Sequence, residues 1–232
     1  MRMSDILYFA GIVVAILSIF ISMSVKSKFS KWSKEPNRRR ITGREVAERM
    51  LHNAGIYDVS VVPAHGVLTD HYNPKNKTVN LSEDVYDKAS IASVAVAAHE
   101  CGHAIQHHNA YAPLVARHKL VPIANIGSRA AIWLFMIGMA LIYITESTSM
   151  AWMIDLGIIA YSCAVLFHII TLPVEFNASK RALVTLRESN ILMEDEMGGA
   201  RKVLSAAALT YVAAAAAAAI QLLRMIAIRN RD

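Results

Sequence analysis

The chain has 232 residues, of which 55% are hydrophobic and only 18% carry a charged side chain. Soluble globular proteins are less apolar and more charged than this, at about 45–50% and 25%. The balance excludes intrinsic disorder, which requires low hydrophobicity, and argues against a purely soluble enzyme. A formal net charge of +6 can serve binding to nucleic acid, binding to anionic lipid, or the orientation of a membrane protein. The two cysteines, Cys101 and Cys163, exclude a disulfide framework and a cysteine zinc cluster.

An uncharged stretch of twenty residues, 6–25, predicts a transmembrane helix near the N-terminus. At about 1.5 Å per residue it spans roughly 30 Å of hydrocarbon. The alternative is a cleaved signal peptide, but its apolar region is shorter and follows basic residues. Here the basic residues come afterwards, within 26–40. The positive-inside rule therefore places this flank in the cytoplasm. Because topology explains these charges, we expect no nucleic-acid partner.

Three further apolar regions follow later in the chain. Residues 120–144 and 151–172 predict a transmembrane hairpin, and the loop between them, 145–150, has no basic residue and so suits the outside. Residues 203–223 are long enough to span but rich in alanine, and basic residues follow them. Spanning would place those basic residues outside, against the rule, whereas a buried cytoplasmic helix would not. Both alternatives remain open, so we expect three or four transmembrane helices.

The part between the first two apolar regions has mixed helix and strand patterns. Residues 42–54 predict a helix, and residues 59–81 predict strands, two of them joined by a turn at 73–77 that contains the pair Asn-Pro. Ser82, followed by acidic residues, marks the start of another helix.

The segment with the clearest chemistry is His99-Glu100-Cys101-Gly102-His103, an H-E-x-x-H motif in a stretch whose preceding residues favour a buried helix. On a helix, residues four apart share a face, so both histidines can bind one zinc ion. Glu100 stands beside the first ligand, where it can act as general base towards a zinc-activated water. The alternative is a pair of surface histidines on an ordinary helix. Cys101 is expected to pack rather than react.

A catalytic zinc needs a third protein ligand. His107 continues the row of histidines, but on a straight helix it lies about 12 Å from His99, too far to share one ion. Glu175 follows the third apolar region and Pro173, and we expect it to begin a new helix at the membrane face. The residues alone leave two alternatives open for Glu175: a zinc ligand, or a carboxylate favoured by the helix dipole.

The motifs HECGHAIQH and LPVEFNASKRAL, supported by LTDHYNPKNKTVNLS and GARKVLSAAALTYVAAA, resemble the bacterial membrane-bound neutral zinc metallopeptidase family. They are also similar to the wider clan of membrane metalloproteases with H-E-x-x-H and a later Glu. The resemblance covers nearly the whole chain. It implies His99, His103 and Glu175 as zinc ligands and Glu100 as the base. The wider clan usually has Asp four residues after that Glu, whereas this chain has Ser179.

We therefore expect a mainly α integral membrane protein with a small β element, built around a zincin-type H-E-x-x-H helix domain. The expected division is an anchor (1–25), a cytoplasmic part with the motif (26–119), the transmembrane hairpin (120–172), a cytoplasmic helix with the third ligand (173–202), and an Ala-rich helix with a basic tail (203–232). The expected function is a multi-pass zinc endopeptidase of the cell membrane, in contact with lipid, that cuts peptide or membrane-protein substrates on the cytoplasmic side. The alternative is a catalytically silent membrane scaffold or metal-binding regulator.

Other polar residues are weaker candidates. Five of them could donate a hydrogen bond to a tetrahedral intermediate: His65, His71, Tyr72, His118 and Arg181. A surface or packing role is the simpler interpretation for each. His168 lies in the third apolar region, where an ionisable side chain is either functional or placed at the headgroup level.

Overall fold

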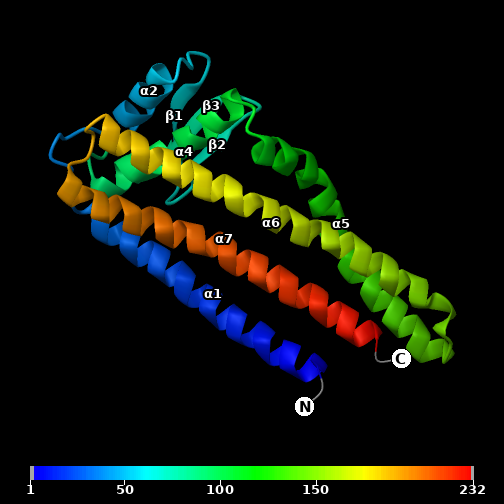
Figure 1. The fold of residues 1–232 in the computed structure, drawn as a ribbon. Helices are drawn as coiled ribbons and strands as arrows, with labels where there is room; N and C mark the ends of the chain where they lie inside the picture. The colour runs from blue at the N-terminus through cyan, green and yellow to red at the C-terminus, as the bar shows by residue number, and fades with distance from the viewer. Residues whose placement is uncertain (1–2, 231–232) are drawn as a thin grey trace. The chain divides into compact units, whose positions relative to one another are not determined.

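The computed structural model describes residues 3–230 and consists mainly of helices (Figure 1). The helices are α1 (Met3–Ser33), α2 (Gly43–Asn53), α3 (Glu83–Tyr86), α4 (Ile91–His108), α5 (Ala112–Thr145), α6 (Ala151–Glu188) and α7 (Glu194–Arg229), with a 3-10 turn, η1, at Thr148–Met150. Four of them, α1, α5, α6 and α7, are long and apolar enough to cross a membrane. The expected fold class is confirmed: a mainly helical protein with a small sheet and four candidate membrane-spanning helices.

The chain separates into two compact units. One contains residues 1–20, 115–172 and 211–232, and is built from α1, α5, α6 and α7 segments. Within it, α5 and α6 pack through glycines: a Cβ at Gly157 would lie 2.9 Å from the carbonyl oxygen of Ala131. Small residues that let helix backbones approach are typical of packing in a membrane. The ion pair of Asp155 with Arg229, at 2.8 Å, joins α6 to α7 in the same unit.

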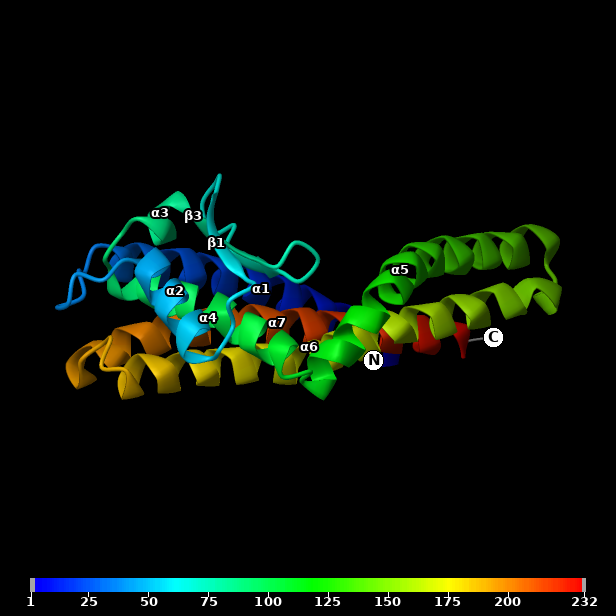
Figure 2. The same ribbon diagram turned by 90° about the horizontal axis from the view of Figure 1, so that it is seen from above.

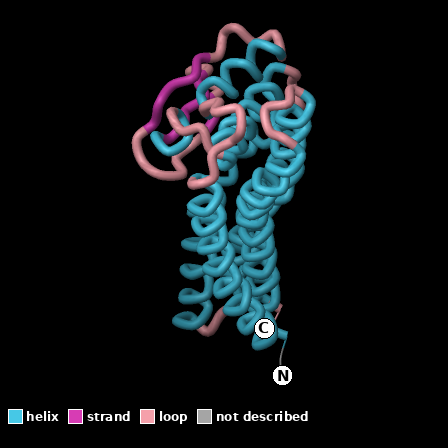
Figure 3. The backbone as a smooth tube through the Cα atoms, turned by 90° about the vertical axis from the view of Figure 1, so that its left-hand side faces the viewer, coloured by secondary structure: helices cyan, strands magenta, loops and turns pink. Residues whose placement is uncertain are grey.

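The other unit contains residues 21–114 and 173–210 and holds the motif helix. Its sheet has the order β1-β3-β2, with β1 (Ser60–Ala64) parallel and β2 (His71–Asn73) antiparallel to β3 (Thr78–Ser82). Figure 2 shows the strands beside α2 and α4, and Figure 3 shows the strands (magenta) lying close together. The expected hairpin turn is confirmed, and the Asn73 side chain accepts hydrogen bonds from the backbone of Lys75 and Asn76. Strand β2 lies at an edge of the sheet.

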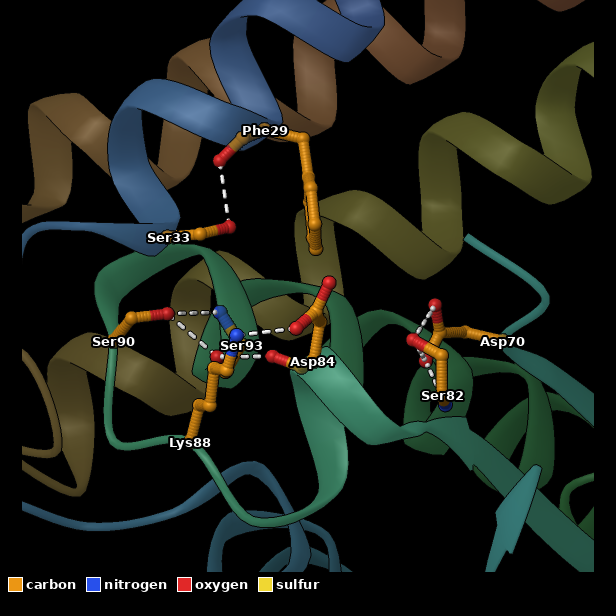
Figure 4. A network of polar contacts seen from close by, with 8 residues as sticks. All are labelled: Phe29, Ser33, Asp70, Ser82, Asp84, Lys88, Ser90 and Ser93. Atoms are coloured by element: carbon orange, nitrogen blue, oxygen red, sulfur yellow. Dashed lines mark hydrogen bonds and ion pairs between the residues drawn. The ribbon is translucent and has the colours of Figure 1, made fainter. Parts of the chain in front are cut away.

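Helix α4 runs through the core of this unit. Most of its residues are buried, and its apolar side chains join a cluster with residues of α2, the sheet and the later parts of α6 and α7. Ser90 caps the start of the helix, and its hydroxyl accepts a hydrogen bond from the backbone N–H of Ser93 at 3.0 Å. The Ser93 hydroxyl in turn donates to the carbonyl of Asp84 at 3.1 Å (Figure 4). These bonds fix the start, and hence the direction, of the motif helix.

The loop that leads into β2 is also held in place. Asp70 accepts hydrogen bonds from the backbone N–H of Ser82, at 2.7 Å, and from its hydroxyl (Figure 4). Burial, the largest influence on this carboxyl, raises its pKa, and the nearby charge of Glu100 acts in the same direction, against the hydrogen bonds from Ser82. The hydrogen bonds between Asp70 and Ser82 tie the start of β2 to the end of β3. They thereby place the edge strand next to α4.

One expectation about the helices is wrong. Glu175 does not begin a new helix, because α6 continues unbroken from Ala151 to Glu188 with Pro173 inside it. Proline removes one backbone N–H, but helices that cross a membrane tolerate this loss when neighbouring groups hold the chain. Here the residues that follow Pro173 are firmly packed: Val174 is fully buried, Glu175 is 2% exposed and Ala178 is fully buried.

Gly102 sets the separation of α4 from α6. A Cβ at this position would lie 2.8 Å from the carbonyl oxygen and 3.1 Å from the Cα of Ala178. Both atoms belong to backbone, so they can move only if the helix moves. The glycine is therefore required for the close approach of the two helices.

We expect Gly102→Ala to destabilise the protein by about 1–3 kcal/mol, the usual cost of overpacking. Gly198→Ala is the matched control, because Gly198 is also helical but has no atom within 4 Å of the added Cβ. That substitution should stabilise α7 by up to about 1 kcal/mol. Thermal unfolding in detergent measures both, and equal effects of the two substitutions would contradict the close approach.

Candidate metal centre

Three side chains converge between α4 and α6. His99 and His103 lie one turn apart on α4, and Glu175 comes from α6. Their potential ligand atoms lie within 4.8 Å of one another. The Oε2 atom of Glu175 is 3.3 Å from Nε2 of His99 and 3.5 Å from Nε2 of His103. The structure thus brings together the three residues expected to bind zinc, although 72 positions separate His103 from Glu175.

This arrangement fits a zinc ion. Two imidazole nitrogens and one carboxylate oxygen are the ligands of many catalytic zinc sites, which keep a fourth position open. With metal–ligand bonds of about 2.0–2.1 Å, ligand atoms at the corners of a tetrahedron lie about 3.3 Å apart. The observed separations of 3.3 and 3.5 Å from the carboxylate to the two imidazoles match that spacing. The three ligand atoms lie within 4.8 Å of one another, so small movements of the side chains bring all of them to bonding distance of one cation.

Electrostatics in the site also favour a cation. Burial lowers the pKa of the His103 imidazole, but its hydrogen bond to Glu175 and the negative charges of Glu100 and Glu175 outweigh burial, so that the pKa is raised. An environment that favours a proton on imidazole is one of negative potential. The same negative potential attracts a divalent ion.

Each histidine is held at its other ring nitrogen. Nδ1 of His99 lies 3.1 Å from the hydroxyl of Ser179 on α6, and Nδ1 of His103 lies 3.0 Å from Oε1 of Gln106. Partners at Nδ1 fix the ring orientation and leave Nε2 for the metal. Ser179 therefore takes part at the position where the wider clan has Asp.

Gln106 links the motif helix to α6. It is fully buried, and its Nε2 donates to the carbonyl of Val174 at 2.9 Å and to Oδ1 of Asn177 at 3.0 Å. Asn177 also accepts a hydrogen bond from Nε of Arg181 at 2.7 Å. Arg181, considered above as a transition-state donor, is thus engaged in this network. We did not predict the role of Gln106, although its spacing of three residues from His103 was visible in the sequence.

Glu100 lies next to the converging ligands but is not among them. Its side chain is buried, at 8% exposed, and Oε2 accepts a hydrogen bond from the backbone N–H of Tyr72 at 3.0 Å. Tyr72 belongs to the edge strand β2. The carboxylate is therefore held between the motif helix and the edge of the sheet, in a defined position.

The remaining candidates lie elsewhere. His107 is outside the converging group, and its Nδ1 lies 2.8 Å from the Tyr72 hydroxyl. His65 and His71 are exposed, with contacts to Glu83 and to the carbonyl of Thr69. His118 and His168 are outside the converging group too.

Cys101 is fully buried, and its thiol donates to the carbonyl of Ala47. Burial raises its pKa far above the usual range for a thiol. This agrees with a packing role.

The fold and the site together define a protein with four apolar helices and a His-His-Glu cluster suited to zinc, of which Glu175 is buried and the two histidines are partly buried. The chain belongs to the family described as "putative neutral zinc metallopeptidase", which matches residues 7–230. It is also 47% identical, over 218 residues, to the "Putative membrane protease YugP" of Bacillus subtilis (strain 168), covering 93% of this chain and 94% of that protein. No solved structure matches. The family resemblance found in the sequence motifs is confirmed.

The network around His103 predicts the effect of losing Gln106. Gln106→Leu removes the acceptor at Nδ1, so we expect zinc affinity to fall by about 10–100-fold, as is usual when such a partner is lost. His107→Ala is the matched control, because it removes a neighbouring polar side chain that bonds to Tyr72 rather than to a ligand. Competition with a chelator measures both, and a larger loss in His107→Ala would mean that the ligands are assigned wrongly.

Proposed function

We propose that this protein is a membrane-embedded zinc endopeptidase in which Glu100 is the general base. The observation that carries the proposal is the convergence of His99, His103 and Glu175, with Glu100 held beside them by the Tyr72 amide. The matching family is described as a metallopeptidase family, and the similar Bacillus subtilis protein is described as a membrane protease. A purely structural metal site needs no base at this position, and this argues against a catalytically silent scaffold.

The roles of the residues follow from their positions. His99, His103 and Glu175 would hold the zinc, which when bound polarises the scissile carbonyl and makes water a stronger nucleophile. Glu100 accepts the proton of the attacking water and passes it to the leaving amine. Ser179 and Gln106 keep the two imidazoles oriented.

Substrate binding is favoured at strand β2. An extended peptide can add to an exposed sheet edge, where its backbone pairs with the strand. Strand β2 lies at an edge of the sheet with His71 exposed, and its Tyr72 amide bonds to Glu100. A peptide that runs along β2 would therefore place a peptide bond close to the base. This arrangement suits an extended or locally unfolded protein segment as substrate.

Four membrane-spanning helices, with the metal site on the cytoplasmic side, best account for the charges. The basic residues within 26–40 follow the first span directly. Spanning by the Ala-rich segment is supported by Arg229, beyond its end, which pairs with Asp155 near the outer end of α6. Arg224 likewise lies over the Tyr8 ring near the start of α1. These two contacts stabilise the basic side chains on the outer side, where the positive-inside rule disfavours them.

A matched pair of substitutions tests the roles of the two carboxylates. Glu100→Gln should keep zinc and lower peptide cleavage by at least about 100-fold, because the amide cannot accept a proton. Glu175→Gln removes the same charge but should weaken zinc binding by about 10-fold or more, along with activity. Zinc content and cleavage of an unfolded protein such as casein are measured for both. Full activity of Glu100→Gln would remove the enzymatic proposal and leave the scaffold.

The orientation is tested with one added cysteine at a time in a Cys163→Ser background, in which the remaining Cys101 is buried. A cysteine at Ser147, in the exposed loop between α5 and α6, should react with a membrane-impermeant maleimide on intact cells. One at Asn76, in the exposed turn between β2 and β3, should react only after the membrane is opened. Labelling in the reverse order would place the active site outside.

A further inference from the structure

A groove separate from the converging ligands runs between the parts of α6 and α7 that belong to the metal-site unit. Its volume is about 660 Å³, within the range of ligand sites. The two helix segments are joined by the short connection 189–193 and run in opposite directions (Figure 1). One end of the groove therefore lies at this connection, and the other lies further along both helices.

The character of the lining changes along the groove. At the end away from the connection, Phe176 and Leu209 line it, and they are 49% and 47% exposed. Large apolar side chains exposed in a groove favour an apolar ligand. Lys180 and Arg201 line its middle beside the apolar Leu183 and Val184, and Arg187 and Glu188 lie near the connection. The groove is thus largely apolar, with two basic side chains in its centre.

The basic charges in the centre are available to a ligand. Arg187 pairs with Glu194 at 2.8 Å, but within residues 3–230 neither Lys180 nor Arg201 forms an ion pair. Glu188 is the acidic residue of the lining, at the end near the connection. An anionic group would therefore be attracted to the centre rather than to that end.

We infer that this groove binds an anionic phospholipid. Lys180 and Arg201 bind the phosphate, and an acyl chain lies along Phe176 and Leu209. Basic pockets between membrane helices on the cytoplasmic side are suited to anionic headgroups. Of the residues that line the groove, Phe176 and Leu209 stand nearest in sequence to the apolar residues 151–172 of α6 and 211–223 of α7, which agrees with a lipid whose chain points into the membrane. The inference rests on the proposed membrane placement of these helices and does not depend on proteolysis.

A lipid in this groove would lie next to a residue of the metal centre. Ser179 lines the same groove, and its hydroxyl lies 3.1 Å from Nδ1 of His99. A bound lipid therefore contacts a residue that orients a ligand. An apolar substrate peptide is the competing occupant, but it would leave Lys180 and Arg201 without an anionic partner.

The test uses the full chain in a non-ionic detergent. Dioctanoyl phosphatidylglycerol and dioctanoyl phosphatidylcholine have the same chains and differ in net charge, and glycerol 3-phosphate carries the phosphate without chains. Binding is measured by native mass spectrometry and by the shift in thermal unfolding. We expect the wild type to bind phosphatidylglycerol at least 5-fold more tightly than phosphatidylcholine, and glycerol 3-phosphate more weakly than either lipid.

Two groove variants and one control complete the test. Lys180→Gln with Arg201→Gln should abolish the preference for phosphatidylglycerol. Lys202→Gln changes the charge of the next residue, which faces the Trp32 ring instead of the groove, and should keep the preference. Ser205→Trp fills the groove from an exposed position and should lower binding of both lipids. Thermal unfolding without lipid identifies any variant that fails to fold.

Three results would overturn the inference. One is equal binding of the two lipids by the wild type, and another is a preference that persists in the Lys180→Gln/Arg201→Gln protein. The third is loss of casein cleavage in Ser205→Trp with lipid binding unchanged, which would assign the groove to substrate. Failure of the proposed proteolysis is distinguishable, because Glu100→Gln is expected to bind lipid as the wild type does.

Discussion

The close contact between α4 and α6 is the constraint on which the site depends. A metal ion with bonds of about 2.0–2.1 Å requires ligands from two helices to meet within a few ångströms. Gly102 allows this, because any larger residue would meet the backbone of Ala178. The motif position between the two histidines is therefore restricted by packing as well as by metal chemistry. A separation larger by one ångström would leave Glu175 out of reach of a metal shared with the histidines.

The buried polar groups at this contact are stable only as a complete set. A buried carboxylate and two imidazoles cost free energy unless each has partners. Ser179 and Gln106 supply the partners at Nδ1, and Asn177 and the Val174 carbonyl engage the amide of Gln106 in turn. Such a network is worth more as a whole than as separate bonds. The same bonds thus hold the two helices together and set the direction of the metal ligands.

The sequence predicts those features that have a local pattern. Three of the long helices follow from long apolar stretches, whereas the sequence left open whether the fourth, Ala-rich one spans the membrane. The β2–β3 hairpin follows from its Asn-Pro turn, and the paired histidines follow from their spacing. The roles of Gly102 and Gln106 depend on which helix lies opposite, and no local pattern contains that information. The unbroken course of α6 was missed for the same reason, since packing around Val174 decides whether Pro173 ends the helix.

Helix α6 contains an apolar stretch and a candidate metal ligand in one element. It is one continuous helix whose first part is apolar enough to span a membrane and whose later part carries Glu175 and Ser179. Glu175 is 2% exposed and its neighbours Val174 and Ala178 are fully buried, so packing within the metal-site unit fixes where the carboxylate lies. An isolated segment of α6 would keep the sequence of the ligand but lose this packing. The third ligand is therefore supplied by the fold of the whole unit and not by its own helix alone.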